Sequence, residues 1–208
     1  MLHYERRAKL KGYTLVIGVD EAGRGPLAGP VVASAVALKD HQFNNKVCDS
    51  KKLTAPKREK AFLEIFEKAY VGIGIINETV IDRHNILEAT YLAMTVAIRQ
   101  LMSKVSSPQI HPQNFSKKVL LLIDGPFFKT DLPYSYRTIV QGDNKSLSIA
   151  CASIVAKVTR DRILKVYDRI FPQYGFHQHK GYPTRKHKQA IQRYGLSMIH
   201  RKTFHYLF

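Results

Sequence analysis

The sequence predicts an α/β fold in which a central mixed sheet is flanked by helices and followed by a small helical extension at the C-terminal end. Five short apolar runs have the length of strands, and four other segments repeat apolar residues with helical period. Three strands precede the longest helical segments, and strand then alternates with helix, an order typical of a mixed sheet covered by helices. Three of the runs also lead to an acid, and ligand sites in open α/β sheets form at the carboxyl ends of strands.

Three strands are expected in the first half of the chain, because short runs of apolar residues are bounded there by turn residues. They cover residues 13–19, 31–38 and 71–76. Between the second and the third, residues 54–69 carry apolar side chains at helical spacing, and Thr54 is a suitable N-cap. This half of the chain therefore supplies most of the sheet.

A long helix is expected after the third strand. Asn85 and Glu88 resemble a capping box, and residues 86–102 repeat apolar side chains with helical period. This helix should be largely buried. Residues 103–117 are polar, contain two prolines and are typical of a loop.

The second half of the chain supplies the remaining strands and helices. One strand covers residues 119–123, and another short strand leads to Gly142. Residues 146–170 form a helix with an apolar start and a basic end. A final short helix over residues 184–194 begins at a Thr cap and stops at a Gly.

Acidic residues stand at the ends of three of these strands. Asp20 and Glu21 directly follow the first run, Asp124 follows the fourth, and Asp143 lies just beyond the fifth. Burial disfavours the charged form of an acid, so paired carboxylates at a strand end are usually held ionised by cations, and Mg²⁺ is the cation that we expect here. One such acid alone is more often a turn residue or a helix cap. All four together favour a metal site.

The charge of the chain is strongly positive. Its 208 residues carry 33 Lys and Arg against 16 Asp and Glu, a net charge of +17. Residues 144–208, with thirteen Lys and Arg and two acids, contribute +11 of this charge. Such a surface concentrates a phosphate backbone through counterion release. A merely soluble basic protein is the plainer alternative, but charge together with an acidic cluster points to a nuclease.

Cysteine usage and the N-terminal residues indicate the compartment. Cys48 and Cys151 lie far apart, without the spacing of a zinc site, and are expected to be reduced thiols. Residues 1–7 lack the apolar stretch of a signal peptide, and no apolar run approaches membrane-spanning length. We therefore expect a cytoplasmic protein.

Seven blocks of residues carry a resemblance to a known family. They cover residues 20–31, 49–53, 124–125, 142–143, 153–161, 181–184 and 200–204. In this order they resemble ribonuclease HII, the type 2 ribonuclease H family, and the Gly-Arg-Gly turn of the first block separates the chain from the related ribonuclease HIII. The resemblance implies a ribonuclease H-like fold, with a catalytic domain over residues 1–170 and a basic helical C-terminal extension, residues 171–208, packed on it.

The resemblance also implies a function. Members of this family are endonucleases that cleave the RNA strand of RNA/DNA hybrids and cut on the 5′ side of single ribonucleotides in duplex DNA, leaving a 3′-hydroxyl and a 5′-phosphate, in ribonucleotide excision repair and primer removal. The four family carboxylates fall on Asp20, Glu21, Asp124 and Asp143, which would act as catalytic residues and as ligands of two Mg²⁺ or Mn²⁺ ions. As a hypothesis, Asp20 bridges both ions. Asp143 then helps to hold the ion that activates water, and Glu21 and Asp124 hold the ion near the leaving oxygen.

Substrate recognition in such an enzyme needs a detector for one 2′-hydroxyl group. Gly23, Arg24 and Gly25 suit this role, because glycines let backbone groups approach a ribose closely. The resemblance places Tyr182 beside the same sugar, although a half-buried turn tyrosine is an equal alternative on the sequence alone. The remaining candidates, which would hold phosphates, are Lys51, Lys52 and Ser146. Paired lysines in a loop are as often merely solvated.

The histidines near the C-terminal end are expected to be structural. His177 and His179 have the spacing of a weak metal clip, but no Cys or acid completes it, so we assign both to the basic surface. His200 is expected to be a hydrogen-bonded histidine rather than a proton donor. The aromatic residues between 203 and 208 could pack on the protein or contact DNA.

Two other functions remain open. A non-catalytic nucleic-acid-binding protein would explain the charge, but it would leave four acids facing the charge of its own ligand. A transposase or resolvase-type nuclease could use a similar acid cluster on the same fold, but it would need a further DNA-recognition module or a dimer surface. The expected partner is nucleic acid, bound by a monomer without membrane contact. A sliding clamp and repair proteins are further candidates that no motif identifies.

Overall fold

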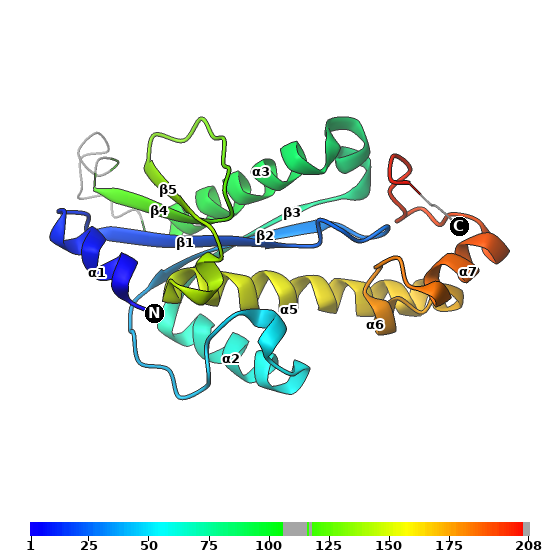
Figure 1. Ribbon diagram of the computed structural model, residues 1–208, viewed down its shortest axis with the longest axis horizontal. Helices are drawn as coiled ribbons and strands as arrows, with labels where there is room; N and C mark the ends of the chain where they lie inside the picture. The colour runs from blue at the N-terminus through cyan, green and yellow to red at the C-terminus, as the bar shows by residue number, and fades with distance from the viewer. Residues whose placement is uncertain (106–115, 117, 206–208) are drawn as a thin grey trace.

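A five-stranded sheet forms the centre of the molecule (Figure 1). The computed structural model describes residues 1–105, 116 and 118–205. The strands are β1 (Leu15–Ala22), β2 (Val31–Leu38), β3 (Ala69–Ile76), β4 (Val119–Asp124) and β5 (Ser135–Ile139). They lie in the order β3-β2-β1-β4-β5, with antiparallel β1–β2 and β2–β3 pairs and parallel β1–β4 and β4–β5 pairs. The predicted mixed five-stranded sheet is therefore confirmed.

Helices cover both faces of this sheet. The α-helices are α1 (His3–Leu10), α2 (Ala55–Lys68), α3 (Glu78–Val105), α5 (Leu147–Ile170), α6 (Phe176–His179) and α7 (Arg185–Tyr194). Short 3-10 helices occur at η1 (Ser50–Lys52), η2 (Gly142–Asn144) and η3 (Pro172–Tyr174). α3 lies on one face of the sheet, and α5 and α2 lie on the other (Figure 1). Across the described ranges, no helix combines the length and apolar character that a membrane crossing needs.

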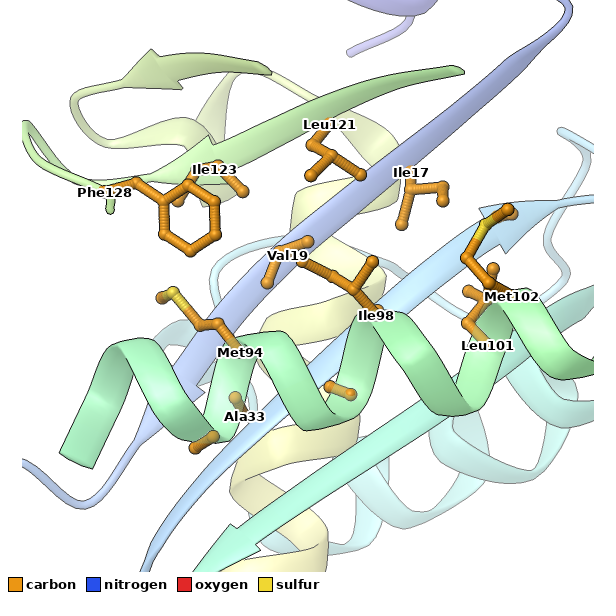
Figure 2. Packing of buried hydrophobic residues seen from close by; sticks show 14 of the residues in the cluster. Ile17, Val19, Ala33, Met94, Ile98, Leu101, Met102, Leu121, Ile123 and Phe128 are labelled. Atoms are coloured by element: carbon orange, nitrogen blue, oxygen red, sulfur yellow. The ribbon is translucent and has the colours of Figure 1, made fainter. Parts of the chain in front are cut away.

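The core under α3 consists of side chains that alternate along β1 and β4. Ile17 and Val19 of β1 and Leu121 and Ile123 of β4 face α3, where Ile98 packs among them (Figure 2). All five side chains are fully buried. Because successive side chains of a strand point to opposite faces, the residues between them face α5.

α5 approaches β1 most closely at Gly18. A Cβ on this residue would lie 2.2 Å from the carbonyl carbon of Ser148 and 2.3 Å from the nitrogen of Ile149. Only glycine leaves room for the backbone of α5 at this point. Since Gly18 stands two residues before Asp20, the contact brings the start of α5 against the carboxyl end of β1.

The N-terminal helix α1 packs against the start of α5, although the sequence predicts no helix before the first strand. Glu5 is buried, and its Oε1 accepts hydrogen bonds from Ser146 Oγ (2.6 Å), Ser148 N (3.0 Å) and Ser148 Oγ (2.9 Å). Ser146 Oγ in turn accepts a hydrogen bond from Ile149 N (3.3 Å) and caps α5. A carboxylate at a helix N-terminus is favourable because that end carries partial positive charge.

β1 is longer than the predicted strand. It continues to Ala22, because Asp20 and Glu21 pair with Ser34 and Ala33 of β2. The two acids therefore stand inside the end of a strand rather than after it. Their main chains are held by the sheet, which limits how far their carboxylates can move.

The helix boundaries also differ from the predicted ones. α3 begins at Glu78 and is kinked at Asn85, where φ is 69°, and Asn85 Oδ1 accepts hydrogen bonds from the nitrogens of Leu87 and Glu88 at 2.9 and 3.1 Å. The predicted Asn cap is therefore confirmed, but helix also precedes it. Thr54 occupies the N-cap position of α2 without a side-chain capping bond. Residues 106–115 and 117 of the predicted loop lie outside the described residues.

The C-terminal segment packs on the turn after β1 and on the far end of α5. Its buried apolar cluster consists of Leu27, Ala28, Leu164, Tyr174, Phe176, Ile191 and Ile199. Phe204 packs against this cluster and lies under the guanidinium of Arg201, 5.0 Å from ring centroid to Cζ. Of the terminal aromatic residues, Phe204 thus packs on the protein, and residues 206–208 lie outside the described part of the chain.

Candidate active site

A cleft opens at the carboxyl ends of β1 and β4. Its volume is about 290 Å³. It is lined by Asp20, Glu21, Ala22, Gly23, Arg24, Gly25, Ser50, Lys51, Asp124, Ser153, Lys157, Arg160 and Tyr182. The cleft therefore brings three of the predicted acids together with the Gly-Arg-Gly turn and with Tyr182.

Asp20 and Asp124 meet because β1 and β4 are parallel neighbours. The register of the two strands ends with the pair of Val19 and Ile123, so the two acids come next on adjacent strands. Parallel strands present their carboxyl ends at the same edge of a sheet. The sheet therefore brings together two acids that lie about a hundred positions apart in the sequence.

Hydrogen bonds orient the two acids of β1. Asp20 is only 5% exposed, its Oδ1 accepts a hydrogen bond from Glu21 N (2.7 Å), and its carboxylate also accepts one from Ser153 of α5. Ser153 Oγ lies 2.9 Å from Ser50 Oγ of η1. Glu21 Oε1 lies 3.4 Å from Arg24 Nη1. Hydrogen bonds from Glu21 N and Ser153 therefore orient the Asp20 carboxylate, and the guanidinium of Arg24 lies beside that of Glu21.

Asp143 approaches the same region from η2, just before α5. It is buried, and its Oδ1 accepts a hydrogen bond from Asn144 Nδ2 (2.9 Å). Gly142 N donates to Asp124 Oδ1 (2.6 Å), which ties η2 to the end of β4. Asp143 does not line the cleft. It lies near enough to Asp124, however, for the two carboxylates to repel each other.

Burial and repulsion from neighbouring carboxylates raise the pKa values of Asp20, Glu21 and Asp143. Burial raises the pKa of Asp20 well above its usual range, and the carboxylates of Glu21 and Asp124 add to the rise. Burial also raises the pKa of Glu21, against the effect of the Arg24 guanidinium. The pKa of Asp143 is raised by burial and by Asp124. The surroundings of these three carboxyl groups thus disfavour their ionised forms when no cation is bound.

The donor set fits hard divalent cations. Carboxylate oxygens are the ligands that Mg²⁺ prefers, and a cation among them would offset the repulsion between them. Among the residues that the structure describes, no three His, Cys, Asp or Glu side chains already form a group able to hold a metal ion. Binding of an ion would therefore require the carboxylates to move closer together than they lie here.

The turn after β1 is held by two buried arginines, of which Arg160 of α5 is the first. It donates to three carbonyl oxygens, from Nε to Pro30 (2.9 Å), from Nη1 to Lys180 (2.8 Å) and from Nη2 to Ala28 (2.9 Å). Burial lowers the pKa of Arg160 to about 10, so it stays charged at neutral pH. One side chain therefore joins the turn to the segment that carries Tyr182.

Arg201 is the second of these arginines and is fully buried. It donates to the carbonyl oxygens of Gly23 (2.6 Å) and Arg24 (3.0 Å) and, through both Nε (2.9 Å) and Nη2 (2.7 Å), of Gly29. Gly23 has a φ of 100°, and a Cβ on it would lie 2.1 Å from Arg160 Nε. Only glycine fits this position, so the two buried cations set the shape of the Gly-Arg-Gly turn.

Tyr182 stands next to this turn in the cleft. The residue is 44% exposed, and its Cε1 would lie 3.6 Å from a Cβ on Gly25. The residue before it, Gly181, accepts a hydrogen bond from Leu27 N (2.8 Å). The two segments predicted to recognise a ribose are therefore neighbours and are hydrogen-bonded to each other.

The other predicted substrate contacts lie in different places. Lys51 lines the cleft. Lys52 is not among the lining residues, and its Nζ lies 2.5 Å from Asn144 Oδ1. Ser146 is fully buried at the cap of α5 and is bonded to Glu5, so the structure does not bring its hydroxyl to the cleft.

Three α5 residues line the cleft without being predicted as contacts, namely Ser153, Lys157 and Arg160. Their spacing of four and then three residues places them on one face of a helix. This spacing in the sequence could have been used to predict them as cleft residues. Lys157 Nζ is bonded to Asp161 Oδ1 at 2.8 Å. The cleft thus has a basic wall facing its acidic edge.

Three histidines of the C-terminal segment lie close together. His187 and His200 are fully buried with their Nε2 atoms 3.1 Å apart, and the ring of His179 stacks on that of His187 with 4.3 Å between centroids. This arrangement agrees with the structural role predicted for His200. The predicted surface role holds for the exposed His177, whose Nδ1 lies 2.7 Å from Asp168 Oδ2, but not for His179.

Acid is expected to destabilise the protein through this buried pair. Burial lowers the pKa values of His187 and His200 to about 4, from 6.5. As pH falls from 6.5 to 4, the unfolded chain takes up protons that the folded chain excludes, so stability falls by on the order of 3 kcal/mol for each histidine, or at least roughly 6 °C in Tm. Thermal unfolding between pH 4 and 7 should show a flatter slope for His187→Gln, whereas exposed His84→Gln should keep the parent slope. An unchanged slope in His187→Gln would contradict this assignment.

Comparison with known proteins gives consistent results. The sequence model of the family described as Ribonuclease HII matches residues 17–207. The chain is 49% identical to ribonuclease HII of Syntrophus aciditrophicus over 205 residues, which are 98% of this chain and 90% of that protein. It is 50% identical to ribonuclease HII of Acetivibrio thermocellus over 205 residues, 98% of this chain and 75% of that protein.

Solved structures show the same fold. The fold matches the ribonuclease HII of Archaeoglobus fulgidus in its complex with PCNA, with a TM-score of 0.71 and 20% identity over 92% of this chain and 95% of that one. It matches ribonuclease H2 of Pyrococcus horikoshii with a TM-score of 0.68 and 25% identity over 93% of this chain and 95% of that one. A ribonuclease HIII solved in complex with Mn²⁺ gives a TM-score of 0.68 and 18% identity over 96% of this chain and 70% of that one. The α/β fold expected from the sequence is therefore confirmed.

Proposed function

Because the chain belongs to the ribonuclease HII family and is thus a ribonuclease H endonuclease, we propose that it cleaves the RNA strand of RNA/DNA hybrids and cuts on the 5′ side of single ribonucleotides in duplex DNA. The products are a 3′-hydroxyl and a 5′-phosphate. One observation carries the proposal. The acidic edge formed by β1 and β4 shares a single cleft with the Gly-Arg-Gly turn and Tyr182, so a reaction site adjoins a site able to recognise ribose.

The four acids are the proposed catalytic and metal-binding residues. Asp20, Glu21, Asp124 and Asp143 would hold two divalent cations, Mg²⁺ or Mn²⁺. Such ions, when bound, supply an activated water and stabilise the leaving oxygen in an in-line phosphoryl displacement. Ser153 orients the Asp20 carboxylate through its hydrogen bond, and Gly142 N orients that of Asp124. These contacts would hold the acids in place on the sheet edge during the reaction.

Backbone groups and Tyr182 are the proposed ribose detector. Arg201 holds the Gly23 and Arg24 carbonyls, which leaves the other backbone groups of the turn and the Gly25 surface for the sugar. A 2′-hydroxyl can donate and accept hydrogen bonds at once, so it can satisfy backbone groups that a deoxyribose leaves unpaired. The Tyr182 ring would stack on the neighbouring nucleotide. Lys51 in the cleft would hold a phosphate, and Lys52, beside it in η1, is a weaker candidate.

A cleavage assay tests this proposal. Labelled duplexes carrying no ribonucleotide, one ribonucleotide or four consecutive ribonucleotides would be incubated with Mg²⁺, with Mn²⁺ and with chelator. We expect cleavage 5′ of the single ribonucleotide and within the four, no cleavage of all-DNA duplex, and none in chelator. Tight binding without cleavage would favour the non-catalytic alternative, and cleavage of all-DNA duplex would favour a transposase-like nuclease.

Divalent cations are expected to stabilise the folded protein. Cations that bind the acids only in the folded state add about 2.7 kcal/mol at a hundred times their Kd. The Tm should therefore rise by roughly 5 to 10 °C between chelator and saturating Mg²⁺. Tm would also be measured with Ca²⁺ and with Na⁺ at the same ionic strength as the Mg²⁺ sample. If Mg²⁺ acts only by screening charges, Na⁺ should raise Tm by the same amount. A Tm that does not respond to Mg²⁺ or Mn²⁺ would count against the four-carboxylate site.

The cellular setting follows from the same proposal. We expect a monomeric, cytoplasmic enzyme in which residues 1–170 carry the reaction and the basic residues 171–208 help to hold the duplex. Ribonucleotide excision repair and primer removal are the processes that require this cleavage. The archaeal relative was solved in complex with PCNA, so a sliding clamp is a candidate partner for this chain as well.

A further inference from the structure

The carbonyl oxygens of residues 180, 181 and 182 all accept hydrogen bonds. Lys180 O accepts from Arg160, Gly181 O accepts from Leu27 N, and Tyr182 O accepts from Thr184 N at 2.8 Å and lies 2.9 Å from His187 Nδ1. Tyr182 is 44% exposed and lines the cleft. Since nearly half of the residue is not covered by the protein, the position of its ring depends strongly on the backbone that carries it.

A chain of hydrogen bonds leads from that backbone into the protein interior. His187 Nδ1 lies 2.9 Å from Tyr182 O, and His187 Nε2 lies 3.1 Å from His200 Nε2. His200 Nδ1 accepts a hydrogen bond from Ser197 N at 2.9 Å. Three segments that are separate in the sequence are therefore joined through two imidazole rings.

The partners determine which nitrogen of each ring carries the proton. A carbonyl oxygen can only accept, so His187 Nδ1 is protonated and donates to Tyr182 O. A backbone N–H can only donate, so His200 Nδ1 is unprotonated and its proton lies on Nε2. His200 Nε2 then donates to the lone pair of His187 Nε2. Both rings are neutral, and the chain of donors runs in one direction, from Ser197 to Tyr182.

His179 supports the same segment from the other side. Its Nε2 lies 2.8 Å from Tyr174 O, so it is the protonated nitrogen, and its Nδ1 accepts from Gly181 N at 3.2 Å. Its ring stacks on that of His187 with an angle of 17° between planes. The Gly181 nitrogen and the Tyr182 carbonyl are thus held by two stacked imidazoles.

We propose that the relay Ser197–His200–His187 is a positioning device that fixes the backbone of Tyr182 and thereby places its ring against the substrate. This inference rests on the proposed function, in which Tyr182 contacts the nucleotide. His187 and His200 are positioning residues and do not touch the substrate. Their effect on cleavage passes through Tyr182 alone.

Two isosteric substitutions test the direction of the relay. The amide nitrogen of asparagine occupies the place of Nδ1 of histidine, whereas that of glutamine occupies the place of Nε2. His187→Asn should therefore keep the donor to Tyr182 O and keep kcat/KM for a single-ribonucleotide duplex within about threefold of the parent. His187→Gln should lose roughly tenfold in kcat/KM, because a misplaced contact residue has an effect of this order or more. Equal activities of the two variants would overturn the relay.

A double-mutant cycle tests whether the effect passes through Tyr182. Tyr182→Ala, His187→Gln and the double variant would be compared in kcat/KM at a temperature where circular dichroism shows all three folded. We expect the double variant to be no less active than Tyr182→Ala, since the ring that the relay positions is already absent. Losses that multiply would show that His187 acts on cleavage by another route and would overturn the proposal.

The relay can also be observed without substrate. Nitrogen-15 NMR of the histidine side chains should show His187 with its proton on Nδ1 and His200 with its proton on Nε2. The opposite tautomers would refute the relay whatever the enzyme cleaves. A protein with these tautomers but no cleavage of any ribonucleotide-containing duplex would instead refute the proposed function, so the two failures are distinguishable.

Discussion

Asp124→Asn is expected to reduce cleavage of a single-ribonucleotide duplex by on the order of 10³-fold or more, while the protein stays folded. Asparagine keeps an oxygen that can accept the hydrogen bond from Gly142 N, so η2 keeps its attachment to β4. The substitution removes the charge of the residue that lies next to Asp20 on the adjacent strand. Initial rates on a labelled duplex, with saturating Mg²⁺ and with Mn²⁺, measure the effect.

A matched control separates loss of this site from a general change of charge. Asp131 is an exposed acid paired with Arg99 at 3.2 Å, and Asp131→Asn should leave the rate within about twofold of the parent. Asp124→Asn should also lose most of the Mg²⁺-dependent rise in Tm, and without metal it should be no less stable, because one source of carboxylate repulsion is gone. A variant that cleaves at more than a tenth of the parent rate would rule out Asp124 as an essential acid.

Arg201→Ala is expected to have the largest effect on stability, a loss of about 3 to 5 kcal/mol, or roughly 10 °C or more in Tm. The substitution leaves the carbonyl oxygens of Gly23, Arg24 and Gly29 without their donor in the interior. It also removes a positive charge that acts on the buried Glu78 carboxylate. Thermal and urea unfolding at pH 7 measure the loss.

The control for this prediction is an arginine of the surface. Arg162 is half-exposed and paired with Glu59 at 2.5 Å, and Arg162→Ala should cost less than about 1 kcal/mol. In Arg201→Ala the Gly-Arg-Gly turn loses its anchor, so cleavage should fall even at temperatures where the variant remains folded. Equal stabilities of the two variants would mean that the buried hydrogen bonds of Arg201 contribute little.

The sheet and the acids could be predicted because both leave local signals. Apolar runs of strand length, each ending near an acid, indicate strands that meet at one edge, and Asp20 and Asp124 do so. The end of β1 could not be predicted, because Asp20 and Glu21 belong to the strand only through pairing with β2. The β2 residues with which they pair lie beyond a Gly- and Pro-rich turn. The pattern of apolar residues within one segment does not show how that segment pairs with another.

The anchors of the cleft could not be predicted for a different reason. Arg160 and Arg201 are long cations in a strongly basic chain, and such residues usually lie on the surface. Only the folded backbone shows that carbonyl oxygens surround them. Ser146, in contrast, is predicted from the sequence to contact substrate, but its hydroxyl donates a hydrogen bond to the buried Glu5 of a helix that the sequence does not predict. The sequence pattern therefore predicts the acidic residues of the cleft, whereas the arginines that hold its backbone are identified only from tertiary contacts.

The hydrogen bond between Arg201 and Gly29 joins residues 172 positions apart, and this separation has a consequence for how the enzyme is made. Contacts between distant residues form slowly, because a long loop must close before they contribute any stability. During synthesis β1 emerges early, but its turn lacks one of its anchors until residue 201 has been synthesised. We therefore expect the Gly-Arg-Gly turn to take its final shape only after the segment that carries Arg201 has packed against it.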